Sequence, residues 1–502
     1  MKSDTSKLPV LEKIGYSLGD AGANFVFQTM ILFQLNFYTD TVGIAAAIAG
    51  SLLLVGRLWD AFFDPMMGVI ADRTNTRWGK FRPWVLWSAL PWGIVMVLAY
   101  TTPTYNSMGK VVYACVTNIL LMTLYSINNT PYSALTGVMT GNVHERTSLS
   151  SYRFVSAMIA QLIIGGFTLP LVAKFGQGND AKGWQMTIGL WAILCVILFA
   201  ITFLSTRERI QPDRRQELAG KQDFRNLLKN GPWIAMFIVT LAHFIVAAMR
   251  GGTVLYFFKY YVNQDHLFSV LQSLGLTHAS NGAAGSGTWY RLLNTFGLIV
   301  DAEHRNTASV GFSLFNMSSQ FVTVIGVLCA TFLSIRFGKK IVVQVGFALT
   351  AVFMASFILL PADAVWGTFA LEYVRALAFA PTIPLLWAMF ADVVDYAEWK
   401  TGRRTTGVIY ATIMFGLKAG LSLGGAMAGG LLKIYGYVPN VPQSAKALLG
   451  IRLTISVYPA VFFLIVVICM FFYKIGKKLN IQIQDELAER RKQFGPALAV
   501  KS

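Results

Sequence analysis

The fold is decided by one stretch of sequence, Arg57-Leu-Trp-Asp-Ala-Phe-Phe-Asp-Pro-Met-Met-Gly68, which closes an apolar run that begins near Gly43. Arg57, Asp60 and Asp64 are spaced i, i+3 and i+7, so they share one face of a helix. The run is long enough to cross a bilayer, which takes about 20 residues. A carboxylate at that depth costs roughly 3 kcal/mol. We therefore interpret the two aspartates as functional groups; the alternative is a charge cluster that only holds helices together.

The composition of the chain is typical of a membrane protein. Of its 502 residues, 55% are hydrophobic and only 13% are charged, against about 25% charged in soluble proteins. The net charge of +18 is not interpreted as a sign of nucleic-acid binding, because the basic residues lie in short loops between apolar runs. The four cysteines are isolated and predict no metal centre. The polar N-terminus does not have the pattern of a signal peptide.

The apolar runs predict an all-α membrane protein with twelve transmembrane helices. The expected segments lie near 14–38, 44–71, 83–102, 109–140, 151–173, 184–205, 232–262, 309–335, 340–360, 364–392, 404–434 and 449–475. Connections rich in Lys and Arg alternate with connections that have few of them, and the basic set is expected in the cytoplasm. An even number of crossings then places both termini in the cytoplasm.

The chain is expected to divide into two six-helix halves. The first covers residues 1–205, a charged cytoplasmic linker covers 206–230, the second half covers 231–476, and a cytoplasmic tail covers 477–502. The long outward loop at 263–308 is expected to hold short helices around 267–276 and 289–298. The loop is either a lid over the outer side or an added segment without a role in transport. Paired six-helix halves are typical of transporters that bind their substrate between the halves at mid-membrane.

Four motifs carry a resemblance to a known family. They are Gly19-Asp-Ala-Gly-Ala-Asn24, RLWDAFFDP at 57–65, RWGKFRPW at 77–84 and ADVVDYAEWKTGRR at 391–404. With these motifs, nearly the whole chain resembles the glycoside–pentoside–hexuronide:cation symporter family of the major facilitator superfamily. The resemblance implies the major facilitator fold, a place in the bacterial inner membrane, and uptake of a sugar or glycoside driven by Na⁺ or H⁺.

The resemblance also implies roles for single residues. Asp60 and Asp64 match the family's cation-binding pair, Ser126 matches a hydroxyl beside that pair, and Lys418 matches a lysine that couples the cation site to the other half. The positions that match sugar contacts are Asn24, Tyr125, Asn129 and Arg153.

Three positions depart from the melibiose-transporting branch of that family. Asn24 and Asn129 stand where that branch has aspartates, and Phe63 stands where it has an asparagine. The loss of two carboxylates makes a galactoside substrate doubtful and favours tolerance of an anionic sugar such as a uronide. The loss of an oxygen ligand at Phe63 favours coupling to protons over coupling to sodium, because Na⁺ needs several oxygen ligands. The hydroxyl of Ser126 offers an oxygen ligand to Na⁺, so it makes the preference for protons over sodium smaller.

The remaining intramembrane charges have alternative roles. Arg57 is expected to neutralise the aspartate pair when the cation is absent. Lys418 requires a carboxylate partner, because an unpaired buried ammonium is costly; that partner makes it either a coupling residue or a static ion pair.

Two residues of the second half are further candidates for the substrate site. Glu372 and Arg375 are spaced i, i+3 and are expected to pair, so Arg250 either faces the cavity or pairs with Asp20. Trp387 either offers its ring to a sugar or belongs to the core.

A cytoplasmic gate is expected where the halves meet at the inner surface. Its members are Asp72, Arg73 and Arg77 from the first half with Asp392 and Asp395 from the second. Opposite charges there would hold the halves together when the site faces outward; the alternative is that these charges only set the topology.

Other classes of function are disfavoured by the sequence. No nucleophile motif, metal cluster or nucleotide loop supports an enzyme or a pump, and no appended domain supports a receptor. The runner-up is cation-coupled transport of an amphiphile such as a lysolipid on the same fold. We therefore expect a secondary transporter that works as a monomer, with no cofactor beyond its coupling ion and a sugar or glycoside as substrate.

Overall fold

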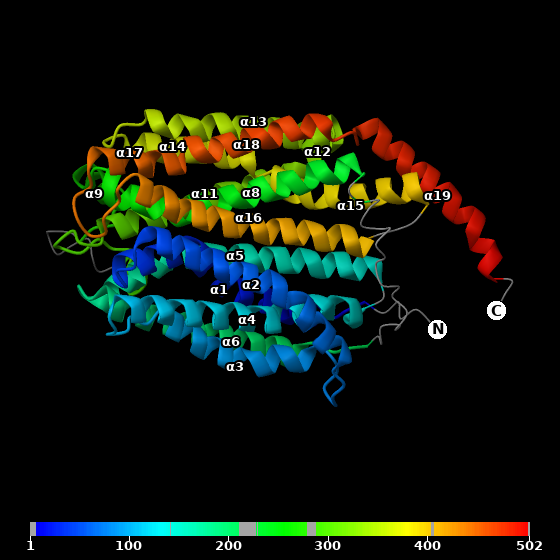
Figure 1. Ribbon diagram of the computed structural model, residues 1–502, viewed down its shortest axis with the longest axis horizontal. Helices are drawn as coiled ribbons and strands as arrows, with labels where there is room; N and C mark the ends of the chain where they lie inside the picture. The colour runs from blue at the N-terminus through cyan, green and yellow to red at the C-terminus, as the bar shows by residue number, and fades with distance from the viewer. Residues whose placement is uncertain are drawn as a thin grey trace.

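The structure, a computed structural model, describes residues 7–140, 142–209, 227, 229–278, 288–402 and 406–499. Most of the expected linker at 206–230 and the 279–287 part of the outward loop lie outside the described residues, as do Arg403 and Arg404. Within the described residues the chain is helical, with two isolated β-bridges and no longer strand. The long helices run side by side along the molecule (Figure 1).

The first half consists of six long helices. They are α1 (Val10–Asn36), α2 (Ala46–Arg73), α3 (Arg82–Ala99), α4 (Ser107–Met139), α5 (Val143–Gly176) and α6 (Asp180–Ser205). A π-helical turn at Phe37–Thr41 extends α1. Apolar side chains of all six helices form one continuous core.

The second half repeats this arrangement with more interruptions. It begins with α8 (Gly231–Tyr256), which a π-helical turn (Phe257–Tyr261) extends. Its further members are α9 (Gln264–Ser273), α10 (Thr288–Thr295), α11 (Thr307–Leu328), α12 (Ala330–Phe337), α13 (Lys339–Ser356), α14 (Val365–Phe379), α15 (Thr382–Thr401), α16 (Thr406–Ile434), α17 (Ala445–Ile455) and α18 (Val457–Phe472). The tail forms α19 (Lys477–Ala499), which leaves the bundle at one end (Figure 1).

The prediction of an all-α membrane protein is confirmed. Eleven helical spans of the described residues are long and apolar enough to cross a membrane. A further 27-residue helix, α1, carries Glu12, Lys13 and Asp20 within its length. The count of spans is thus consistent with the twelve expected, and the two short helices expected in the outward loop are present as α9 and α10.

Several helix boundaries were predicted wrongly. Helix α5 begins at Val143 and not near residue 151, so Arg153 lies inside a helix and not at the end of a loop. The apolar pattern missed the start of α5, residues 143–150, because most of the side chains there are polar. The segment expected at 364–392 is divided between α14 and α15 next to Pro381, which has no N–H to donate to the helix ladder.

The two halves meet along three helix pairs, namely α1 with α8, α2 with α16, and α5 with α11. In the second pair the backbones touch, because glycines face each other. A Cβ atom at Gly429 of α16 would lie 2.2 Å from the carbonyl oxygen of Ala46 and 2.9 Å from Cα of Gly50 in α2. Small residues allow this close approach between membrane helices.

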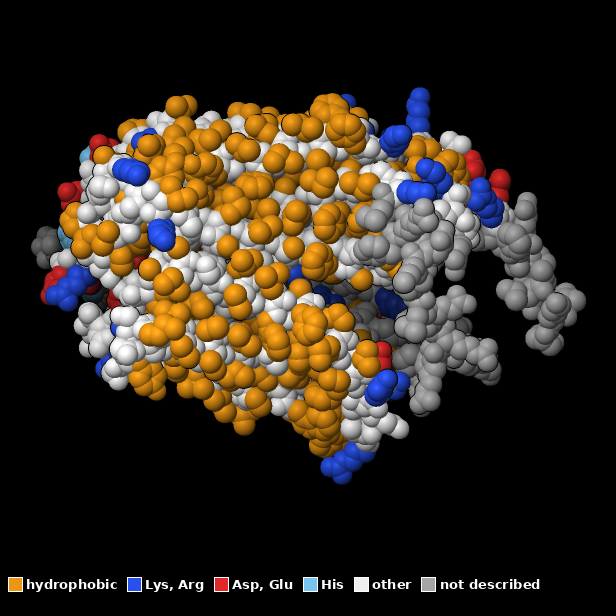
Figure 2. Space-filling view, in the orientation of Figure 1, with side chains coloured by type: hydrophobic (Ala, Val, Ile, Leu, Met, Phe, Trp, Pro, Cys, Tyr) orange, Lys and Arg blue, Asp and Glu red, His pale blue; other side chains and the backbone are white. Residues whose placement is uncertain are grey.

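The ends of the bundle differ. Both termini lie at one end, which we call the terminal end, and α9 lies at the other, which we call the α9 end (Figure 1). A recess between the halves is visible toward the terminal end (Figure 2). At the α9 end the halves are joined by hydrogen bonds between the α1 extension and the second half. The structure therefore shows a molecule that is closed at the α9 end.

Candidate functional site

The centre of the molecule holds a cluster of charges that joins the two halves. Asp60 and Asp64 come from α2, and Lys418 comes from α16. The Lys418 Nζ lies 2.8 Å from Asp60 Oδ2 and also forms an ion pair with Asp64. The hydroxyl of Ser126 in α4 donates to Asp60 Oδ1 at 2.6 Å, and the hydroxyl of Thr130 donates to Asp64 Oδ1 at 3.3 Å.

Burial divides the two carboxylates into different environments. The Asp60 side chain is completely buried, whereas 32% of the Asp64 side chain and 16% of the Lys418 side chain are exposed. Two carboxylates and two hydroxyls supply the oxygen atoms that a hard cation prefers. The ammonium of Lys418 already occupies the space between the carboxylates, so a cation that binds there must displace it.

Lys418 has the carboxylate partner that the sequence required, whereas the neutralising role expected of Arg57 stays a prediction. The direct ion pairs with the two aspartates are made by Lys418. The guanidinium of Arg57 lies over the ring of Phe27, 4.9 Å from its centre. Although Arg57 and Asp60 share one face of α2, their side chains form no ion pair within 4.0 Å among the described residues.

A second polar group lies on the inner faces of α1, α4 and α5. Arg153 forms an ion pair with Asp20 at 3.1 Å and lies over the ring of Tyr132. Asn24 donates to the backbone oxygen of Asp20 at 2.8 Å, and its own amide oxygen accepts from Gln161 at 3.3 Å. All of these except Tyr132 are partly exposed. Of the residues in this group, sequence reasoning missed Gln161, because a single glutamine in an apolar helix gives no pattern.

A pair of neighbours in α4 adds to this polar group. Asn129 donates from Nδ2 to the hydroxyl of Tyr125 at 3.2 Å. Tyr125 stacks on Phe27 with the ring centres 6.2 Å apart. Because Phe27 also lies under Arg57, these aromatic rings stand between the polar group and the region around Arg57.

Arg250 does not pair with Asp20. Its guanidinium binds Glu372 at 2.6 Å, within the second half. Glu372 also binds Arg375 at 2.5 Å, as expected from their spacing, and accepts from Ser319 at 2.7 Å. The Arg250 side chain is 13% exposed, and its guanidinium is paired with the buried carboxylate of Glu372. This is the guanidinium that was expected to contact the substrate.

The role of Trp387 in the substrate site stays a prediction. Its side chain is 43% exposed, and its ring contacts Phe390 with the centres 5.5 Å apart. The exposure excludes the expected alternative of a core residue.

The charges of the expected gate lie near the terminal end. Asp392 binds Lys339 of its own half at 2.7 Å, Arg77 lies over the ring of its neighbour Trp78, and Asp72 and Arg73 are exposed. Asp395 takes part in a further interaction. The latch between the halves stays a prediction.

The loop between α2 and α3 is held by a single carboxylate. Glu208, just after α6, accepts from the backbone N–H groups of Lys80, Phe81 and Arg82 at 2.9, 2.8 and 2.9 Å. These groups form the N-terminus of α3, where the helix dipole favours a negative charge.

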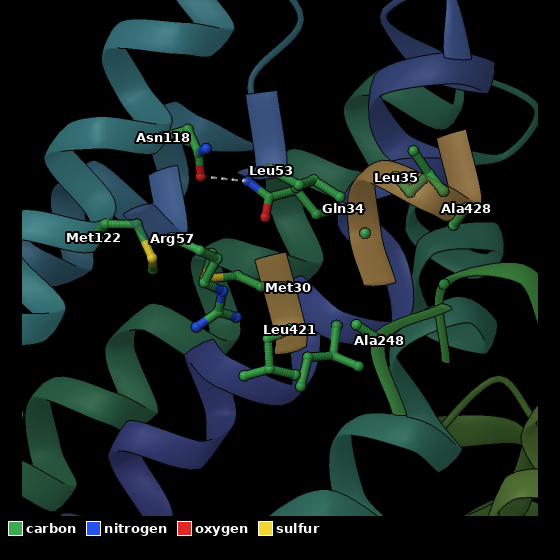
Figure 3. A pocket seen from close by; sticks show the side chains of 13 residues that line it. Met30, Gln34, Leu35, Leu53, Arg57, Asn118, Met122, Ala248, Leu421 and Ala428 are labelled. Atoms are coloured by element: carbon green, nitrogen blue, oxygen red, sulfur yellow. Dashed lines mark hydrogen bonds between the residues drawn. The ribbon is translucent and has the colours of Figure 1, made fainter. Parts of the chain in front are cut away.

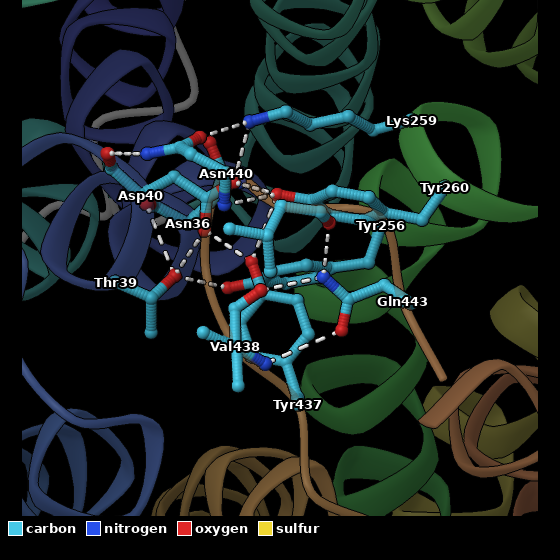
Figure 4. A network of polar contacts seen from close by, with 11 residues as sticks. Asn36, Thr39, Asp40, Tyr256, Lys259, Tyr260, Tyr437, Val438, Asn440 and Gln443 are labelled. Atoms are coloured by element: carbon cyan, nitrogen blue, oxygen red, sulfur yellow. Dashed lines mark hydrogen bonds and ion pairs between the residues drawn. The ribbon is translucent and has the colours of Figure 1, made fainter. Parts of the chain in front are cut away.

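A network at the α9 end closes that side of the molecule (Figure 4). The carboxylate of Asp40 accepts from Lys259 at 2.6 Å, from the hydroxyl of Tyr260 at 2.8 Å and from that of Tyr437 at 2.5 Å. Asn440 donates to the backbone oxygen of Asp40 at 2.7 Å. Burial, followed by the adjacent Asp40 carboxylate, raises the pKa of the Tyr437 phenol far above its usual value, so the phenol remains a donor.

Sequence reasoning missed this network. Asp40 stood in the short loop 39–43 that was noted only for its lack of basic residues. Its partners lie more than 200 positions away in the chain, and only the fold brings them together. The one signal was an acidic residue in a loop where little else is charged.

Comparisons with known proteins indicate a family of sugar transporters. The family model described as "MFS/sugar transport protein" matches residues 15–314 and 305–477. The chain is 33% identical over 499 residues to YagG of Escherichia coli (strain K12), whose name describes a candidate glycoside/cation symporter, with 98% of each chain covered. It is 32% identical over 482 residues to the isoprimeverose transporter of Lactiplantibacillus pentosus, with 94% of this chain and 90% of the relative covered.

Solved structures support the fold. A bacterial homologue of the human lysosomal transporter Spinster, in an inward-facing and unoccupied conformation, superposes with a TM-score of 0.60 at 13% identity. The superposition covers 95% of this chain and 99% of that one. At this identity the likeness shows the arrangement of the helices alone.

Proposed function

Because this chain belongs to the MFS/sugar transport protein family, we propose that it is a secondary active transporter that carries a sugar or glycoside together with a cation by alternating access. The observation that carries the proposal is the cluster of Asp60, Asp64 and Lys418 at the contact of the two halves. The amphiphile alternative is not favoured, because the named relatives are a glycoside/cation symporter and an isoprimeverose transporter.

The cluster provides a physical basis for coupling. Two carboxylates from one half bind one ammonium from the other half, and this ion pair stabilises the contact between α2 and α16. A cation that enters takes over the carboxylates and displaces the ammonium. The halves then lose an attraction at mid-depth, so occupancy of the cation site changes the free energy of the conformational step.

We propose the proton as the coupling ion. The ring of Phe63 stacks on Trp59, with the centres 6.1 Å apart, and supplies no oxygen ligand. The Asp64 side chain is partly exposed, whereas the Asp60 side chain is completely buried, so Asp64 is the group that a proton reaches first. A proton needs only one carboxylate oxygen to bind, whereas a hard metal cation needs several oxygen ligands.

The substrate site is proposed between Asn24, Asn129, Arg153 and Trp387. The amides of Asn24 and Asn129 offer both donors and acceptors, as a ligand rich in hydroxyls requires. Arg153 already binds one carboxylate, that of Asp20, so the group as a whole is neutral. It is therefore suited to neutral glycosides and does not repel an acidic one.

The proposed orientation follows from the charges. Basic residues such as Arg73, Arg77 and Lys339 gather toward the terminal end, so this end faces the bacterial cytoplasm by the positive-inside rule. The α9 end then faces outward, and the conformation described above faces inward. We further propose that the transporter works as a monomer, since the whole site is built from one chain.

Uptake into proteoliposomes tests the proposal. The purified protein is reconstituted, and a panel of neutral glycosides and glucuronides is offered with Na⁺ present or absent at two pH values. We expect uptake of at least one sugar that rises with an inward proton gradient and is insensitive to Na⁺. Uptake that depends on Na⁺ and ignores pH would refute proton coupling, and uptake indifferent to every ion gradient would refute symport.

A further inference from the structure

A small pocket of about 30 Å³ lies between the halves, and Figure 3 shows the side chains that line it. It is formed by α1, α2, α4, α8 and α16, and most of its walls are apolar. Three polar side chains from the first half line it, namely Gln34, Arg57 and Asn118. The pocket is separate from the polar group around Asn24 and Arg153, since it shares no lining residue with that group.

Arg57 is the unusual member of this pocket. Its side chain is only 7% exposed, and its guanidinium lies among the lining side chains in the view of Figure 3. No hydrogen bond or ion pair of Arg57 is present within the described part of the chain. Its guanidinium lies over the face of Phe27, and the Asp60 carboxylate acts on it only through a longer-range electrostatic attraction. A buried charge without a hydrogen-bonding partner is costly, so an arginine in this position indicates a ligand that it binds.

The two amides beside Arg57 are held in place by each other. Gln34 donates to Tyr38 at 2.9 Å and to Asn118 at 3.1 Å, while Asn118 donates to the backbone oxygen of Leu52 at 2.8 Å. The amide oxygen of Gln34 is buried and has no described partner. The pocket thus combines five cationic N–H donors of Arg57 with one free acceptor, which suits an anionic group that has a hydroxyl or a water molecule beside it.

The charges around the pocket link it to the cation site. Asp60 and Asp64 carry two negative charges, and Lys418 and Arg57 carry two positive charges, so the four groups are neutral together. A coupling cation that binds the aspartates leaves an excess of one positive charge in a region of low dielectric constant. An anion beside Arg57 removes that excess, so each ion favours the binding of the other.

We propose that Arg57, Gln34 and Asn118 form an anion subsite, which accepts a carboxylate-sized anionic group when the aspartate pair has taken its cation. The group has two sources of the same chemistry: an acidic substituent on the sugar, or a free inorganic anion such as chloride. The link to the cation rests on the proposed function, whereas the subsite itself rests on the geometry of Arg57.

Binding measurements on the full-length protein in detergent test the subsite. Glucuronate is compared with glucose to probe the acidic substituent, and chloride is compared with the bulkier methanesulfonate to probe a free anion. Each is followed by the shift of the thermal unfolding midpoint and by titration calorimetry at pH 5.5 and 7.5. We expect glucuronate or chloride to bind at least tenfold more tightly than its comparison compound. If the coupling cation is a proton, we expect tighter binding at pH 5.5 than at pH 7.5, because the two ions favour each other's binding.

Variants decide whether Arg57 is responsible. Arg57→Gln is expected to lose at least tenfold in affinity for that anion, and Arg57→Lys to recover part of it. In Asp64→Asn, which imitates a neutralised carboxylate, the anion is expected to bind equally well at both pH values. If Arg57→Gln does not fold, Gln34→Leu and the two pH values in the wild type carry the test.

The outcomes separate this proposal from the proposed function. Anion affinity that is unchanged in Arg57→Gln, or anions that bind no better than their comparison compounds, would overturn the subsite even if sugar uptake is driven by protons. Anion binding that depends on Arg57 but not on Asp64 or pH would overturn its link to the cation. Anion binding that depends on both, in a protein that carries no sugar, would leave the subsite standing and refute the proposed function.

Discussion

We predict that closure of the α9 end depends on the contact between Gly429 and α2, and alanine at this position tests the prediction. A Cβ at Gly429 would lie 2.2 Å from the carbonyl oxygen of Ala46 and 2.9 Å from the backbone of Gly50. Real Cβ atoms do not come closer than 3.0 Å to such atoms. The helices α2 and α16 therefore have to move apart by on the order of 1 Å, as overpacking in a rigid interior requires.

The expected effect is a shift between conformations. Overpacking costs typically about 1–3 kcal/mol, and this strain disappears when the halves separate at the α9 end. A value of about 2 kcal/mol raises the population of the outward-open form relative to the closed form about 30-fold. Gly430→Ala is the matched control, because a Cβ at Gly430 meets nothing within 4 Å and both changes alter helix propensity equally.

Accessibility of a cysteine measures the shift. Met30 lines the pocket on the α9 side and is 4% exposed, so Met30→Cys serves as reporter in a variant without the four native cysteines. A membrane-impermeant thiol reagent is added from outside to right-side-out vesicles. We expect faster labelling with Gly429→Ala than with Gly430→Ala. Equal rates in the two variants would refute the role of this contact in closing the α9 end.

Three further predictions concern other contacts. Asp40→Ala removes the acceptor shared by Lys259 and Tyr437, so the same reporter is expected to be labelled faster; an unchanged rate would show that the network does not hold the halves together. Lys418→Met is expected to abolish uphill accumulation of the substrate while its exchange across the membrane continues, whereas normal accumulation at equal expression would show a static role. Glu208→Gln weakens three bonds to the N-terminus of α3, which is expected to cost about 1–2 kcal/mol and lower the unfolding midpoint in detergent; an unchanged midpoint would contradict this.

Most of the fold could be predicted from the sequence, because a segment that crosses the bilayer must have a long apolar run. Each span is an apolar run of known minimum length, so the segments at 44–71 and 404–434 correspond closely to α2 and α16. The pattern failed where a helix continues into water, as in the first turns of α5. Breaks within apolar runs, such as that between α11 and α12, leave no trace in hydropathy.

The site was predictable only in part. The spacing of Asp60 and Asp64 on one face needed no tertiary information, and Lys418 required a carboxylate wherever it lay. The choice of partner was not local: Arg57 lies on the same helix as the aspartates, yet Lys418 from the other half binds them. Arg250 likewise forms an ion pair with Glu372 and not with Asp20, because the choice of partner depends on which helices are neighbours.

The central claim is that the aspartate pair binds the coupling cation at the contact between the halves. Proton movement during substrate flux tests it most directly: proteoliposomes without a pH gradient receive substrate, and the external pH is followed for the wild type and for Asp64→Asn. The account predicts that substrate entry makes the external medium of the wild type more alkaline, and that Asp64→Asn lets substrate move down its gradient without protons. Equal alkalinisation per transported sugar in both proteins would contradict the account.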